Sequence, residues 1–149
     1  MNPVLCVIDL TPASVSVLGV SAGLAMRLRA PLTVLYPYRI MPDKEPIADY
    51  RKSLLQKAQH DFIELEQKLH LNGSLQYEFR AEVGFLSDRV EAFLRQHTVL
   101  LVAMGEKMAL ERNESGLNNL QELMKRIPVP VLVVPEHYET DIYLMKGQD

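Results

Sequence analysis

Residues 4 to 12 of the chain read VLCVIDLTP, and this stretch decides the fold. Val4 to Ile8 form a continuous apolar run, which is typical of a parallel strand that helices cover on both faces. Thr11 then predicts a helix cap, with Pro12 at the first helical position. A buried strand that leads directly into a helix indicates the repeating unit of an α/β sheet.

The same alternation of strand and helix continues along the 149 residues. Further strands are predicted at Leu32 to Tyr36, Leu75 to Val83, Val99 to Met104 and Val131 to Val134. Leu75 to Val83 alternates apolar and polar side chains, which indicates a strand at a sheet edge with one face in water. Helices are expected after Thr11, at about Ile47 to Leu71, after a cap at Ser87 and from about Gly116. The order predicts an α/β fold with a doubly wound, five-stranded parallel sheet and helices on both faces.

Composition argues against several classes of protein. The formal net charge is −3 and the chain has no run of basic residues, so nucleic acid is not an expected partner. Cys6 is the only cysteine, which rules out an internal disulfide, and no metal site is expected. No apolar run approaches the roughly 18 residues of a membrane span, and no basic leader is recognisable. We expect a cytoplasmic protein with one domain over residues 1–136 and a C-terminal tail over residues 137–149.

The sequence also indicates where a ligand would bind. In a doubly wound sheet, ligands lie beyond the carboxyl ends of the strands, where the strand order reverses. Asp9 to Pro12 and the segment that begins at Met104 and Gly105 are expected at that place. Each segment leads into a helix N-terminus, whose free amides favour an anion. Asp9 either accepts hydrogen bonds from a ribose or a base, or satisfies neighbouring backbone amides.

Several segments, in this order and spacing, resemble the universal stress protein family. They are the first strand with Asp9 and Thr11, Gly84 before the third helix, the strand ending in Met104 and Gly105, and the final run Pro128 to Val134. The match covers Val4 to Val134. It implies an adenine nucleotide alpha hydrolase-like fold, a role in stress response or regulation, and a division into members that bind ATP and members that do not.

The family resemblance also implies homodimers that pair through the last strand. Such a strand is an aggregation hazard when its edge is bare, and pairing with a second copy removes the hazard. We therefore expect a homodimer, while a further protein partner stays open. The expected interface residues are Val129, Val131, Leu132, Val133 and Val134.

The chain departs from the pattern of the ATP-binding members. There, the loop after the fourth strand reads G-x2-G-x9-G-[S/T], and its glycines let backbone amides approach the phosphates. Counted from Gly105, the second glycine is replaced by Met108, the third by Asn118 and the hydroxyl residue by Asn119. We therefore predict a non-catalytic binding module that needs no cofactor and does not hold ATP in the family manner.

Two alternatives stay open. In the first, the chain binds ATP or AMP through an altered loop, with Lys107 and Arg112 supplying charge to the phosphates; otherwise residues 106–115 are a solvated loop. In the second, side chains of the protein itself fill the crevice and the domain only binds a partner. The residues expected to hold a nucleotide in the first alternative are Asp9, Leu10, Thr11, Met104, Gly105, Lys107 and Gly116.

Overall fold

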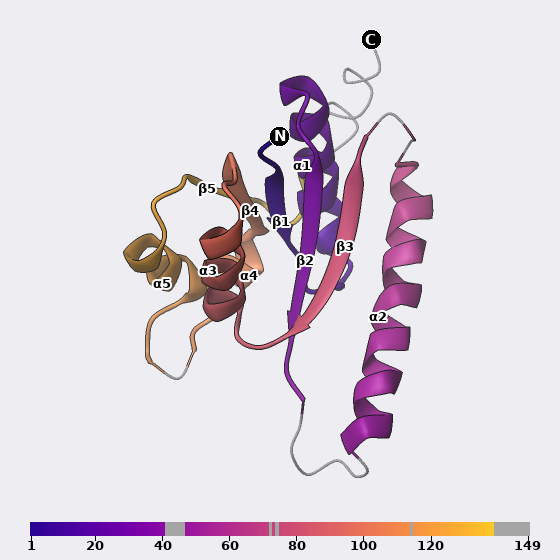
Figure 1. The fold of residues 1–149 in the computed structure, drawn as a ribbon, viewed down its shortest axis with the longest axis vertical. Helices are drawn as coiled ribbons and strands as arrows, with labels where there is room; N and C mark the ends of the chain where they lie inside the picture. Colours follow the sequence, from indigo (N-terminus) through magenta and orange to yellow (C-terminus); the bar gives the residue numbers. More distant parts are fainter. Residues whose placement is uncertain (41–46, 72, 74, 114, 139–149) are drawn as a thin grey trace.

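A computed structural model of the chain describes residues 1–40, 47–71, 73, 75–113 and 115–138. Strands and helices alternate as far as β4, which two helices follow, and all five predicted strands form, joined in one parallel sheet (Figure 1). The elements are β1 (Val4–Val7), α1 (Ser14–Leu28), β2 (Leu32–Tyr38), α2 (Ile47–Leu69), β3 (Tyr77–Val83), α3 (Leu86–Gln96), β4 (Leu101–Gly105), α4 (Glu106–Leu110), α5 (Asn119–Arg126) and β5 (Val131–Val134).

The strand order is β3-β2-β1-β4-β5, which confirms the predicted doubly wound sheet. β1 pairs with β2 on one side and with β4 on the other, so the order reverses between β1 and β4. Val7 lies opposite Met104 in this register, and the carboxyl ends of the two strands therefore meet. β3 lies at one edge of the sheet, as its alternating sequence predicted, and β5 lies at the other.

The sheet separates two hydrophobic cores. Val4, Cys6 and Ile8 point into the core that α1 and α2 cover, whereas Leu5 and Val7 point into the core that α3, α4 and α5 cover. All five of these side chains are fully buried. Because both faces of β1 are covered, both must be apolar, which explains the unbroken apolar run from which the fold was predicted.

Two helices begin differently from the prediction, because the expected caps have other partners. α1 begins at Ser14 with no side-chain cap, and the Thr11 hydroxyl donates to Asp9 instead. α3 begins at Leu86, and the Ser87 hydroxyl donates to Glu122 of α5. Since a hydroxyl beside a carboxylate makes a stronger, charge-assisted bond, these serine and threonine side chains leave the helix amides uncapped.

The segment after β4 is also more ordered than the predicted solvated loop. Residues 106–110 form α4, because Met108 and Ala109 pack into the core beneath α5. Arg112 then pairs with Asn118 in an antiparallel bridge. α5 begins at Asn119, three residues later than expected, where the Asn118 side chain caps the amide of Gln121.

The chain after β5 turns back onto α1. The buried Ser16 hydroxyl donates to the carbonyls of Glu136, at 2.6 Å, and Tyr138, at 3.3 Å. The first residues of the predicted tail therefore contact the domain, and residues 139–149 lie outside the described residues. None of the helices in the described part of the chain combines the length and the apolar character of a membrane span.

Candidate functional site

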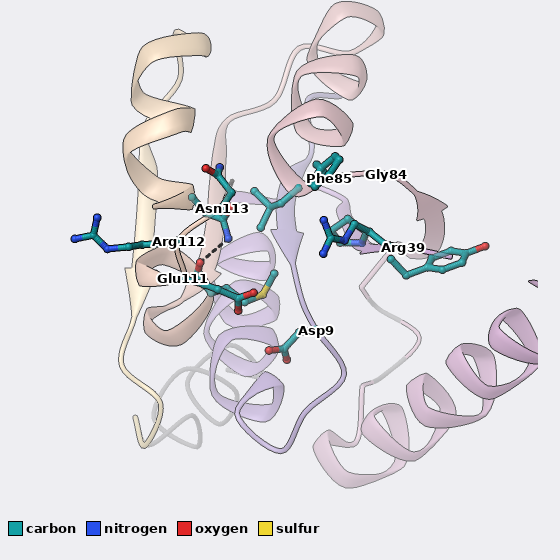
Figure 2. A pocket seen from close by; sticks show the side chains of 12 residues that line it. Asp9, Arg39, Gly84, Phe85, Glu111, Arg112 and Asn113 are labelled. Carbon is teal, nitrogen blue, oxygen red and sulfur yellow. Dashed lines mark hydrogen bonds between the residues drawn. The ribbon is translucent and has the colours of Figure 1, made fainter. Parts of the chain in front are cut away.

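A cleft of about 480 Å³ opens at the carboxyl ends of the strands, beside the point where the strand order reverses. This volume lies in the range of small-molecule sites. Its walls come from the end of β1, the end of β2, the turn between β3 and α3, and the segment that follows α4 (Figure 2). The lining residues are Asp9, Pro37, Tyr38, Arg39, Gly84, Phe85, Leu86, Met108, Glu111, Arg112, Asn113 and Asn119.

Asp9 organises the turn that follows β1, on the wall of the cleft. Its Oδ1 accepts hydrogen bonds from the Thr11 amide at 3.0 Å, the Thr11 hydroxyl at 2.6 Å and the Ser14 hydroxyl at 3.0 Å. These bonds close the turn in which Leu10 adopts a left-handed conformation, with φ of 62°, that is costly for a side chain other than glycine. The structure therefore gives Asp9 the stabilising role considered from the sequence, and it also leaves Asp9 on the cleft wall.

The structure brings only some of the predicted nucleotide residues together. Gly105 and Lys107 lie with Asp9 around a second cavity of about 10 Å³, which has room for no more than a water molecule. Met104 is fully buried in the core. Leu10 packs against the core that α1 and α2 cover. Thr11 and Gly116 line neither cavity.

Arg39 lines the cleft at the end of β2, and this cation was not predicted from the sequence. Arg39 lies over the exposed ring of Phe85, with its guanidinium carbon 4.7 Å from the ring centroid. This contact is a cation–π interaction. β2 runs two residues further than predicted, to Tyr38, so Arg39 follows the strand directly. A cation at the carboxyl end of a strand is the signal that could have revealed it.

Comparison with solved structures finds several that share this fold at low sequence identity. Universal stress protein UspA from Lactobacillus plantarum superposes with a TM-score of 0.70 at 17% identity, covering 89% of this chain and 97% of that one. A universal stress protein in complex with cAMP gives a TM-score of 0.59 at 18% identity, covering 91% and 97%. The chain has the universal stress protein fold. No protein-family model matches its sequence, and no curated protein shows significant similarity to it.

A third structure with the universal stress protein fold is that of the protein from Archaeoglobus fulgidus in complex with dAMP. Its TM-score is 0.58 at 16% identity, and the match covers 90% of this chain and 98% of that one. These likenesses confirm the fold predicted from the resemblance. At such identities they carry the fold alone.

In this chain's version of the fold, side chains fill the positions where the ATP-binding pattern has glycine and a hydroxyl. The Met108 carbonyl accepts a hydrogen bond of 2.8 Å from Asn119 Nδ2, and the Met108 side chain is buried. The Asn118 side chain accepts from the amide of Gln121, and the amide of Asn119 donates to the Glu111 carbonyl. These groups are therefore already bonded within the protein.

The two cations considered as substitutes for that loop do not point into the cleft. Arg112 donates to the carbonyl of Gly116 at 2.9 Å, and its guanidinium points away from the cleft in Figure 2. Lys107 borders only the small second cavity. Among the residues that line the cleft, Arg39 is therefore the cation that faces it.

A polar network behind the cleft joins α3 to α5. Glu122 accepts hydrogen bonds of 2.8 Å from both Ser115 and Ser87, and these bonds lower the pKa of its carboxyl group. Arg126 donates to Asp88 at 2.8 Å. The network fixes the segment after α4 against α3, and so holds two walls of the cleft in place.

Proposed function

We propose that this protein is a non-catalytic stress-response or regulatory module that acts as a homodimer and does not hold ATP through a glycine loop. The observation that carries this proposal is the state of the loop after β4. The backbone and side-chain groups of Met108, Asn118 and Asn119 are engaged with one another and with α5. The amides of Asn118 and Asn119 donate to the Gln121 side chain and to the Glu111 carbonyl, so a triphosphate held by these amides would have to break both bonds and displace the buried Met108 side chain.

The open cleft supports a second candidate, in which the module binds a smaller nucleotide. Two of the proteins that share the fold are described in complex with cAMP and dAMP, which are both nucleoside monophosphates. In this chain the cleft has a suitable volume and Asp9 on its wall. Asp9 and the carbonyls of the strand ends would accept hydrogen bonds from ribose hydroxyls, without any contribution from the loop after β4.

A titration with nucleotides tests both statements. A ligand that binds only the folded state raises the melting temperature once its concentration exceeds the dissociation constant. We expect AMP or cyclic AMP at millimolar concentration to stabilise the protein, and Mg-ATP to stabilise it no more than AMP does. A clearly larger stabilisation by Mg-ATP would show that the triphosphate is recognised, and would overturn the first statement.

The homodimer is proposed from the exposed edge of β5. Along the described sheet, β5 pairs only with β4, and Leu132 on β5 is 36% exposed. Two apolar side chains on the neighbouring helices are more exposed, Leu110 of α4 at 57% and Met124 of α5 at 65%. A second copy related by a two-fold axis would pair with this edge and cover apolar surface beside it.

The homodimer can be tested by blocking a backbone amide of β5 that faces away from β4. The Pro130 carbonyl accepts from the Val102 amide, so the alternation of the strand turns the backbone groups of Val131 and Val133 away from β4. Val133→Pro removes one outward amide, whereas the control Val133→Ala keeps it and loses similar packing. We expect sedimentation velocity to show a dimer for the wild type and for Val133→Ala, and a monomer for Val133→Pro. A wild-type monomer at micromolar concentration would contradict the proposal.

A further inference from the structure

One wall of the cleft carries a cation that no described residue neutralises. Arg39 has Phe85 as its contact, and no carboxylate in the described part of the chain lies close enough to form an ion pair with it. Figure 2 shows the Arg39 side chain reaching from the end of β2 into the cleft. The aromatic ring holds the guanidinium from one side, so its donors stay available to a ligand.

The opposite wall carries hydrogen-bond acceptors. Asp9 and Glu111 both line the cleft, and Figure 2 shows their carboxylates on the side away from Phe85. Asp9 uses Oδ1 for the turn that follows β1, and Oδ2 has no bond among the described residues. Carboxylate oxygens accept from hydroxyl groups, and they repel a second or third phosphate.

The charge on the two walls limits the ligand to one compact anionic group. Arg39 is the one cation that faces the cleft among its lining residues, and two carboxylates stand across from it. A guanidinium binds a phosphate in a bidentate manner, with charge-assisted hydrogen bonds. A triphosphate would bring several further negative charges close to Asp9 and Glu111, whereas a monophosphate needs only the one guanidinium.

We propose that Arg39 is the anion-binding residue of the cleft, and that it selects a nucleoside monophosphate whose phosphate lies against Arg39 and whose ribose hydroxyls face Asp9 and Glu111. This inference rests on the proposed function, because it assigns the ligand of the same cleft. It places the phosphate at the end of β2, on the other side of the cleft from the loop after β4.

Calorimetric titration of the full chain with AMP and with adenosine tests the assignment. We expect the wild type to bind AMP about tenfold or more tightly than adenosine, since a hydrogen bond to a charged group adds this much or more. Arg39→Ala should remove that preference and leave the affinity for adenosine unchanged. The control Arg112→Ala removes a cation from the same lining that points away, and should leave both affinities unchanged.

The outcomes separate this inference from the proposed function. Equal affinity of the wild type for AMP and adenosine would overturn the role of Arg39 and leave a nucleoside site standing. Loss of AMP binding in Arg112→Ala, with Arg39→Ala unaffected, would move the phosphate to the loop after β4 and also overturn it. Absence of binding by both ligands at millimolar concentration would overturn the nucleotide proposal together with the inference. Because Arg39 is exposed, its replacement should leave the fold intact. Circular dichroism of each variant verifies this.

Discussion

Replacing Asp9 by alanine tests the stabilising role of the turn that follows β1. The substitution removes the acceptor of three hydrogen bonds, from the Thr11 amide, the Thr11 hydroxyl and the Ser14 hydroxyl. A hydrogen bond to a charged group contributes about 1.5–3 kcal/mol, but the half-buried donors regain part of this from water. The left-handed Leu10, which these bonds hold, keeps its conformational cost. We therefore expect Asp9→Ala to lower the free energy of unfolding by about 2 kcal/mol.

The matched control is Asp9→Asn, which removes the charge and keeps an acceptor oxygen at the same position. Its expected loss is less than about 1 kcal/mol, because neutral acceptors still bond the same donors. Urea unfolding followed by circular dichroism measures both values. In a thermal scan, the alanine variant should melt about 4–8 °C lower than the wild type.

Two outcomes would refute this reasoning about Asp9. If the alanine and asparagine variants unfold within about 0.5 kcal/mol of each other, the acceptor does not hold the turn. If both match the wild type, Asp9 has no stabilising role. The expected result also shows which variant should be used in ligand-binding experiments, since only Asp9→Asn removes the charge and keeps the turn closed.

Three further predictions concern other side chains. Burial raises the pKa of Cys6 to about 12, so a thiol reagent should react with Cys6 only as fast as the protein unfolds; rapid reaction of the native protein would contradict this. The hydrogen bond to Glu66 raises the pKa of Tyr77 to about 12. The stability it contributes should therefore be complete below about pH 10 and lost towards pH 12, and tyrosinate absorbance should show Tyr77 ionising earlier in Glu66→Ala. Gly84→Ala should cost about 1–3 kcal/mol in urea unfolding, because φ is +143° there and a Cβ would lie 2.9 Å from Arg89 Nε; an unchanged midpoint would exclude strain.

The sheet could be predicted from the sequence because a strand that is buried on both faces must be apolar at successive positions. β1 is apolar at every position and fully buried, and β3 alternates because it lies at the edge. The helix starts were harder to predict, since a hydroxyl can bond to a partner far away in the sequence. Ser87 bonds to Glu122, which lies 35 residues further on, and no local pattern contains that contact.

Only the part of the candidate site that depends on the end of a single strand could be predicted from the sequence. Asp9 lies two residues after the end of β1, and the reversal of strand order places it on the cleft wall. Arg39 and Glu111 were missed because their positions depend on how far β2 extends and on α4, which forms through the packing of Met108. Such long-range packing leaves no periodicity in the sequence.

The order of the strands also determines when the cleft can form during synthesis. β1, β2 and β3 are neighbours in the sheet and come from the first 83 residues, so they can pair while the rest of the chain is still being made. β4 must then return to β1 across a long stretch of chain, and closing so long a loop is slow. We expect the half-sheet to fold first, with the edge of β1 bare until β4 arrives. A chain interrupted before residue 101 would keep that edge open, and it would aggregate rather than bind any ligand.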